Sequence, residues 1–189
     1  MQIKVEYNLN GIEGLCVITP AVHGDARGYF SETYNENDMR EAGFDIKFVQ
    51  DNQSSSVKGV LRGLHFQINH PQTKLVRVII GRVFDVAVDL RKGSPTFGKY
   101  YGLELSAENH KQFLIPKNFA HGFLVLSDRA EFCYKCDDFY HANDEGGIIY
   151  SDPEINIKFP EISCPLILSE KDKNWGKLQD FINIKKERI

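Results

Sequence analysis

The middle of the chain alternates hydrophobic and polar residues over short segments. Residues 74–80 and 83–90 follow this period of two on either side of Gly81 and Arg82, which predicts two strands about a tight turn. Further short segments rich in β-branched and aromatic residues lie between turn-rich stretches, and we expect strands at 101–105, 112–115, 122–126, 131–136 and 155–159. Many short strands at close spacing are typical of a β-sandwich or barrel.

Helical signals are few. Asn35 suits the N-cap of a short helix that runs to Ala42, and Gly43 is a typical stop. A second short helix is expected from Ser169 through Lys173, and a polar tail over 177–189 is either helical or loose. The sequence therefore predicts one all-β domain over residues 1–189, with its core over about 12–175. The predicted form is a jelly-roll (cupin-like) β-sandwich or barrel with a few short helices.

Composition excludes several classes of partner. The chain has 189 residues and a net charge of −3, with no block of five like charges, which argues against nucleic acid and against an anionic membrane surface. No apolar run approaches the roughly 20 residues of a membrane span, and the first residues lack the apolar stretch of a signal peptide. We therefore expect a cytoplasmic protein that does not bind a membrane.

The four cysteines are too few to predict a disulfide framework. Cys133 and Cys136 form a C-x-x-C, but they lie in a predicted strand, where positions three apart face opposite sides. This placement favours buried, reduced thiols over a zinc or redox site.

Two segments each place one histidine among apolar residues and glycines. They are 59–67, which contains His65, and 115–123, which contains His121, and together they predict an active-site strand pair. Metal-binding cupin barrels place two histidines one residue apart in the first such segment, whereas here the second place holds Gln67. Because a catalytic metal site customarily needs three N or O ligands, the sequence predicts no metal and a neutral imidazole as general base. A buried structural histidine is the alternative for each.

Other polar residues suggest an anion site. Arg27, Arg62, Lys74 and Lys171 lie near glycines or within apolar runs, and arginine matches phosphate in a bidentate fork. With Gln50, Asp51 and Asn52 they could form a pocket for an anion and a base, although each basic residue alone is more often a surface charge. The alternation allows Tyr134 and Tyr140 to point inward, with packing as the alternative.

A further signal comes from eight segments in this order: 25–32 (DARGYFSE), 48–52 (FVQDN), 60–65 (VLRGLH), 74–78 (KLVRV), 85–89 (DVAVD), 94–98 (SPTFG), 120–123 (AHGF) and 168–172 (LSEKD). Together they resemble the dTDP-4-dehydrorhamnose 3,5-epimerase family. The resemblance runs from about residue 12 to 175.

The resemblance implies a metal-free jelly roll without a cofactor, active as a homodimer in dTDP-L-rhamnose biosynthesis. Such an enzyme inverts C3 and C5 of dTDP-4-dehydro-6-deoxy-D-glucose to give dTDP-4-dehydro-L-rhamnose. By resemblance His65 is the base, Asp172 the carboxylate that orients it, and Tyr134 the acid on the opposite face of the sugar. The resemblance also implies substrate-binding roles for Arg62, Lys74 and His121 at the sugar and phosphate, for Gln50, Asp51, Asn52, Glu145 and Lys171 at the nucleotide, for Tyr140 by stacking, and for Arg27, Phe30 and Glu32 at the thymidine across the dimer.

Elementary chemistry agrees with these roles. Removing the weakly acidic proton beside the C4 ketone leaves an enolate that needs a donor, which Lys74 or Arg62 could supply. Inversion needs an acid facing the base, and a tyrosine hydroxyl can serve. Asp172 paired with Nδ1 of His65 would strengthen the base, but Ser169 to Asp172 also fits a helix cap.

Several functions stay open at this point. An epimerase that acts at one centre, or on another nucleotide-linked 4-keto sugar, would use the same catalytic residues. A sugar-nucleotide-binding cupin without catalysis is less consistent with a histidine, a carboxylate and a tyrosine in matching places. Gln67 argues against a metal-dependent cupin oxygenase or isomerase.

Overall fold

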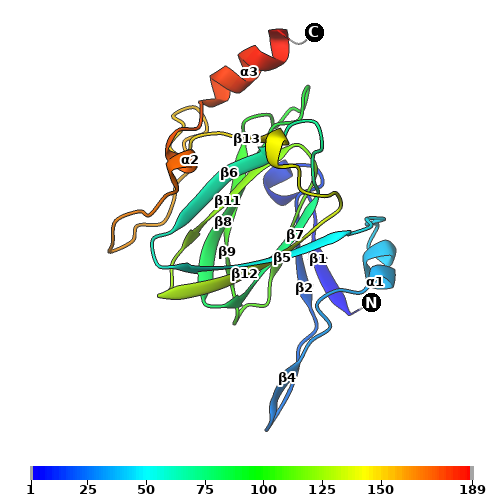
Figure 1. The fold of residues 1–189 in the computed structure, drawn as a ribbon. Helices are drawn as coiled ribbons and strands as arrows, with labels where there is room; N and C mark the ends of the chain where they lie inside the picture. Colours follow the sequence, from blue (N-terminus) through cyan, green and yellow to red (C-terminus); the bar gives the residue numbers. More distant parts are fainter. Residues whose placement is uncertain (1, 188–189) are drawn as a thin grey trace.

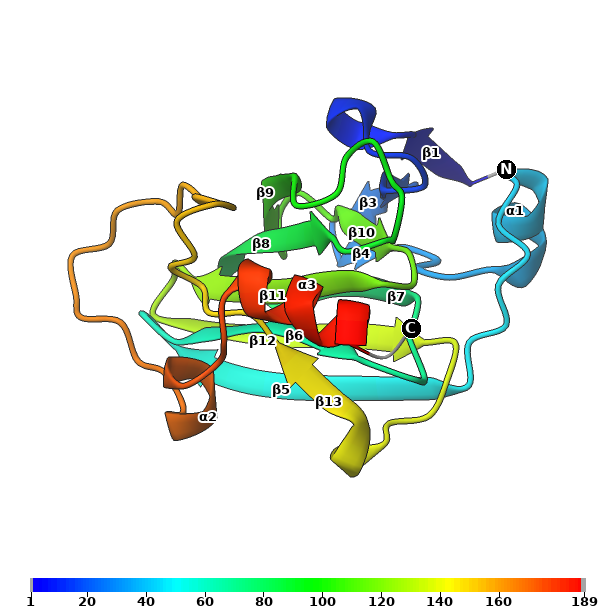
Figure 2. The same cartoon turned by 90° about the horizontal axis from the view of Figure 1, so that it is seen from above.

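Two antiparallel sheets face each other in this computed structural model, which describes residues 2–187. The six-stranded sheet has the order β1 (Ile3–Glu6), β2 (Cys16–Pro20), β10 (Gln112–Ile115), β7 (Lys74–Ile80), β12 (Arg129–Cys136) and β5 (Gln50–Val57). The five-stranded sheet has the order β13 (Glu145–Gly147), β6 (Leu61–Gln67), β11 (Phe119–Val125), β8 (Arg82–Asp89) and β9 (Tyr100–Ser106). Figures 1 and 2 show these layers, which confirm the predicted jelly-roll class.

Short elements complete the fold. A separate hairpin of β3 (His23–Asp25) and β4 (Gly28–Phe30), called the arm below, projects from one end of the molecule (Figure 1). The helices are α1 (Glu36–Glu41), α2 (Glu170–Lys173) and α3 (Leu178–Glu187), with 3-10 turns η1 (Leu9–Gly11) and η2 (Ala142–Asp144). None of the helices within residues 2–187 combines the length and the hydropathy that crossing a membrane requires.

The predicted helix signals are confirmed. The Asn35 side chain accepts hydrogen bonds from the backbone N–H groups of Asn37 and Asp38 at the start of α1, as an N-cap does. Gly43 follows that helix with φ +87°. Ser169 caps α2 in the same way. The tail left open by the sequence forms α3 over Leu178–Glu187, and residues 188–189 lie outside the described residues.

The bounds of the predicted strands are confirmed to within three residues, with one exception. The exception is the segment 155–159, which forms no strand. The Asp152 carboxylate accepts hydrogen bonds from the backbone N–H groups of Glu154 and Ile155, and Asn156 has φ +52°. These bonds close a turn in place of strand pairing, while Ile155 stays buried in a core cluster.

The space between the sheets is apolar over most of its length and polar at one end. Val76 and Phe132 of the six-stranded sheet pack with Ala87 and Phe123 of the five-stranded sheet, and the rings of Phe123 and Phe132 stack at 4.3 Å. Inner-face positions of β7 recur every second residue, so the row that contains Val76 ends in Lys74. The change from apolar to polar side chains along one strand places a polar cavity next to the core.

Candidate active site

The two predicted histidine segments are neighbouring strands. β6 and β11 pair antiparallel, and His65 lies directly opposite His121, so both imidazoles project from the same face of the sheet. The register shifts between His121 and Phe123, where Gly63 has φ +125° and a Cβ on it would lie 2.6 Å from the Gly122 Cα. This irregularity brings Arg62 to the same cavity as His65, although positions three apart in a regular strand face opposite sides.

Two adjoining cavities between the sheets share Asn52, His65, Lys74 and Tyr134. Both sheets contribute to them. The predicted residues that line one or both cavities are Gln50, Asp51, Asn52, Arg62, His65, Lys74, His121, Tyr134, Tyr140 and Glu145. Ten residues scattered over 96 positions of sequence are thus brought together at one place.

His65 and Asp172 form a dyad. Nε2 of His65 lies 2.5 Å from Oδ1 of Asp172, whose residue is only 3% exposed, and Nε1 of Trp175 donates to the same oxygen at 3.3 Å. Burial alone raises the pKa of the Asp172 carboxyl, but its hydrogen bonds and the charge of His65 bring that pKa below its usual value. The carboxyl is therefore ionised at neutral pH and available to an imidazolium.

The contact differs from the expected one in the ring nitrogen involved. The sequence interpretation paired Asp172 with Nδ1, whereas the structure pairs it with Nε2. An ionised carboxylate only accepts, so Nε2 carries the proton of neutral His65 and Nδ1 carries the lone pair. Nδ1 lies 3.9 Å from Oε1 of Glu145, a residue that lines the cavity. The basic nitrogen is thus on the cavity side.

Residues 169–172 form the expected helix cap, and Asp172 is also part of the dyad. The Ser169 hydroxyl accepts a hydrogen bond from the backbone N–H of Asp172, which caps α2. The Asp172 side chain is not used by that cap and points to His65. Lys171, the residue before Asp172 in α2, forms an ion pair with Glu145, and this pairing raises the pKa of the Lys171 ammonium.

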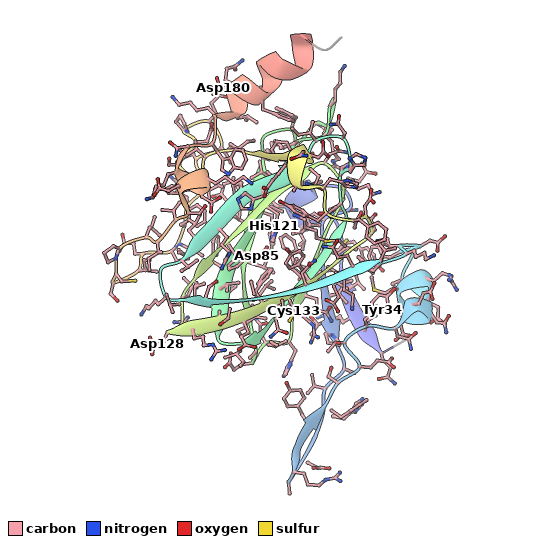
Figure 3. All side chains as sticks on the ribbon, viewed as in Figure 1. Tyr34, Asp85, His121, Asp128, Cys133 and Asp180 are labelled. Atoms are coloured by element: carbon pink, nitrogen blue, oxygen red, sulfur yellow. The ribbon has the colours of Figure 1, made fainter. Side chains whose placement is uncertain are left out.

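A second pair of a histidine with a carboxylate, His121 with Asp85, lies in the interior, as Figure 3 shows for these labelled residues. Nε2 of His121 lies 2.9 Å from Oδ1 and 3.0 Å from Oδ2 of Asp85, which is fully buried. Burial raises the pKa of Asp85, and His121 and Lys74 oppose that rise. For the Lys74 ammonium, burial has the opposite effect and lowers the pKa, while Cys136, Asp85 and Glu145 act to raise it.

Tyr134 reaches the cavity from the six-stranded sheet, whereas His65 reaches it from the five-stranded sheet. Burial raises the pKa of the Tyr134 phenol, with nearby Cys136 and Glu145 adding to the rise and Arg62 opposing it. The hydroxyl therefore keeps its proton at neutral pH. A base and a protonated phenol on facing walls can take a proton from one side of a bound carbon and return one to the other.

The predicted nucleotide residues on β5 alternate between two directions. Gln50 donates to Asn52 at 2.9 Å, and both side chains lie on the cavity side. The carboxylate of Asp51 instead forms an ion pair with Lys135 at 2.8 Å and is 62% exposed. Asp51 thus borders the cavity while its charge is engaged elsewhere.

Three predicted residues lie apart from the cavity within one chain. Arg27 and Phe30 are on the arm and Glu32 follows it. Arg27 is paired with Asp25 at the exposed tip, and Phe30 lines a different cavity, beside Arg77. A single chain does not bring these residues to His65.

Sequence reasoning assigned no role to Asp85 or Trp175. Asp85 carried one usable signal, because it is an acidic residue at a position of β8 that the alternation turns inward. Trp175 lies outside every predicted element, yet its ring contacts His65 edge to face at 6.0 Å. Both cysteines of the C-x-x-C are buried and free, as predicted. Among the described residues, no group of three or more His, Cys, Asp or Glu side chains is arranged to hold a metal ion.

Comparison with known proteins decides the family. A family model described as dTDP-4-dehydrorhamnose 3,5-epimerase matches residues 10–180. The chain belongs to this family. A dTDP-4-dehydrorhamnose 3,5-epimerase of Methanothermobacter thermautotrophicus is 54% identical over 170 residues, which cover 89% of this chain and 92% of the relative. The predictions of the epimerase family and of an enzyme are confirmed.

Other members of the family extend the comparison. The crystal structure of dTDP-6-deoxy-D-glucose-3,5-epimerase from Legionella pneumophila in complex with dTDP-4-keto-L-rhamnose has a TM-score of 0.90 and 48% identity, covering 94% of this chain and 93% of that chain. A dTDP-4-dehydrorhamnose 3-epimerase of Streptomyces niveus is 40% identical, covering 87% of this chain and 79% of the relative. The family therefore includes a relative named for one centre as well as relatives named for two.

Proposed function

We propose that this chain inverts C3 and C5 of dTDP-4-dehydro-6-deoxy-D-glucose and so forms dTDP-4-dehydro-L-rhamnose, the step that the closely similar relatives are named for. One observation supports this most directly. The dyad of His65 with Asp172 and the protonated phenol of Tyr134 come from facing sheets and line the same cavity. This is the arrangement that inversion at a carbon requires.

The first step is removal of a proton. Nδ1 of His65 takes the proton from the carbon beside the C4 ketone, and the electron pair of the C–H bond forms the enolate. Asp172 stabilises the imidazolium that results, through a charge-assisted hydrogen bond. Lys74 or Arg62 donates to the enolate oxygen, and one such donor typically lowers the barrier by about 3–4 kcal/mol.

The second step returns a proton from the opposite face. The hydroxyl of Tyr134 protonates the same carbon, which inverts its configuration. The tyrosinate then recovers a proton and His65 releases the one it took, so the net reaction changes only configuration. No metal or cofactor is needed for proton transfer at a carbon next to a ketone, and the absence of both stays a prediction.

The nucleotide part of the substrate binds at the Gln50 to Asn52 strand and at Lys171, and the arm of a second copy completes the site. The arm exposes two aromatic side chains, Tyr29 by 65% and Phe30 by 70%, and neighbouring exposed apolar surface of this kind is typical of interaction sites. In a homodimer, Arg27, Phe30 and Glu32 of one copy would contact the thymidine bound to the other. An equilibrium sedimentation measurement tests the dimer, which a monomer at micromolar concentration would contradict.

The reaction is tested by incubating the protein with dTDP-4-dehydro-6-deoxy-D-glucose in D2O and following C3 and C5 by NMR. We expect deuterium at both carbons and formation of the L-rhamno product. Deuterium at C3 alone would support the second candidate, a single-centre epimerase, which the 40% identical Streptomyces niveus relative favours. No exchange at either carbon would contradict the proposed activity.

A further inference from the structure

The loop over residues 137–144, called the crossover loop, passes from the six-stranded sheet to the five-stranded sheet. It connects β12, which carries Tyr134, to β13, which begins with Glu145. Tyr140 lies in the middle of the loop and lines the cavity together with Glu145. The position of the loop therefore sets one wall of the proposed substrate site.

Hydrophobic burial does not hold the middle of this loop. Residues 139–143 are all exposed, and Phe139 and Tyr140 are 60% and 52% exposed. A segment with exposed side chains moves easily unless polar contacts fix its backbone. The crossover loop does have such contacts: Thr73 donates to Asp137, Gln72 donates to the carbonyl of Asp138, and Asn69 and His70 donate to Asp144.

The central contact comes from Gln67. Its Nε2 donates to the backbone carbonyl of His141 at 2.9 Å, and its Oε1 accepts from the backbone N–H of His141 at 2.8 Å. The amide thus pairs with one residue's backbone as a neighbouring strand would, and both of its polar atoms are used. Gln67 is 6% exposed and lies two residues after His65, on the same side of β6.

We infer that Gln67 is a positioning residue, which fixes the crossover loop so that Tyr140 and Glu145 face the nucleotide sugar; this inference rests on the proposed function. One further contact to Tyr140 agrees with it, since the Tyr140 backbone N–H donates to Gln50 at 3.0 Å. The ring of His141 also stacks on His70 at 3.9 Å, but that pair is open to solvent. The Gln67 amide is buried, so water competes with it less than with these two contacts.

The test compares Gln67→Met with wild type. Methionine is close to glutamine in length and volume but cannot pair with the His141 backbone. We expect KM for the nucleotide sugar and Kd for dTDP, measured by calorimetry, to rise about tenfold, while kcat stays within about threefold. This split is expected because Tyr140 and Glu145 contact bound substrate throughout the reaction and transfer no proton. Hydrogen exchange of the backbone amides over 137–144 should become faster.

A matched control is Thr96→Val. It also removes a buried hydrogen bond at nearly constant volume, from Thr96 to Asp89 at 2.7 Å, in a loop that borders neither cavity. It should lower thermal stability without changing dTDP affinity or exchange in the crossover loop. If Gln67→Met does not fold, Gln67→Glu keeps a polar side chain of the same length, and its carboxylate cannot donate to the His141 carbonyl, so it should also weaken dTDP binding.

Several results would overturn the inference. A loss of stability without a change in KM or Kd would show a purely structural role. A higher KM with normal amide exchange would show direct contact with substrate, and a lower kcat at normal KM would place Gln67 in the chemistry. The exchange and dTDP measurements need no turnover, so they give an answer even if wild type fails to epimerise the proposed substrate.

Discussion

Replacing Asp172 by asparagine tests the dyad with the smallest change of shape. The carboxylate is buried, and it accepts from Nε2 of His65 at 2.5 Å and from Nε1 of Trp175 at 3.3 Å. An amide of the same shape keeps an oxygen for one of these donors and brings an NH2 group as well. If that NH2 group turns toward Nε2, the proton of neutral His65 moves to Nδ1, and the nitrogen that faces the cavity is no longer basic.

The magnitude follows from two effects. A hydrogen bond to a charged group contributes roughly 1.5–3 kcal/mol, against about 1 kcal/mol for a neutral one, so loss of the charge raises the barrier by about 1–2 kcal/mol. That difference corresponds to roughly 5- to 30-fold in rate. The wrong tautomer adds to it, and in a comparable carboxylate–histidine pair it costs up to about 10⁴-fold. We therefore expect kcat of Asp172→Asn to fall by roughly 10²- to 10⁴-fold.

The assay is deuterium exchange at C3 and C5 of the substrate, together with dTDP affinity by calorimetry. Exchange should slow at both carbons while dTDP affinity stays within about threefold, because Asp172 contacts His65 and Trp175 and does not line the cavity. Ser169→Ala is the matched control, since it removes the α2 cap but leaves the carboxylate, and it should cost about 1 kcal/mol of stability with turnover near wild type. Turnover of Asp172→Asn within threefold of wild type would refute the dyad.

The other predictions concern the base, the acid, the metal and acid stability. His65→Ala should abolish deuterium exchange at both carbons with dTDP affinity within a few fold; exchange that persists would move the base to another residue. Tyr134→Phe should cut net epimerisation by roughly 10²-fold or more, while NMR still finds deuterium with retained configuration at one carbon or more. Dialysis against EDTA should leave turnover unchanged, and elemental analysis should find no stoichiometric divalent ion. Asp89 is buried, and although burial raises its pKa, hydrogen bonds from Arg91, Ser94 and Thr96 lower that pKa to about 2. Asp89→Asn should therefore lose about 2 kcal/mol of unfolding free energy at pH 7, and in urea titrations this difference should shrink as the pH falls from about 4 to 2, where wild type itself loses the contribution.

Local pattern predicted the strands and the main polar positions. The pairing of His65 with His121 followed from two segments with the same mixture of apolar residues and glycine, and the caps at Asn35 and Ser169 depend only on neighbouring residues. The segment 155–159 shows where this reasoning fails. Ile155 of this segment is buried in the core, but hydrogen bonds from the backbone to the Asp152 carboxylate form a turn there instead of a strand.

Long-range partners were not predictable from pattern, and the pairing of Asp172 with His65 came from the family resemblance alone. Asp172 is separated from His65 by 107 residues, and only the packed structure shows that its Oδ1 meets Nε2 of His65 and also accepts from Nε1 of Trp175. The partnership of Asp85 with His121 and the clamp of Gln67 on His141 have the same character. The Asp85 contact depends on β8 and β11 being neighbours in the sheet, whereas the other two depend on the course of segments after β12 that carry no periodic strand signal.

The place of Trp175 gives this chain a built-in optical probe. Trp175 is the one tryptophan in the sequence, so ultraviolet-excited indole emission originates at a single position. That indole donates to Asp172, contacts the His65 ring and lies 5.5 Å from the Lys171 ammonium. Because indole emission responds to the charges around it, a change in protonation of the dyad or in the partner of Lys171 alters the spectrum of the unlabelled protein. Stopped-flow fluorescence can then time events at the dyad within one catalytic cycle.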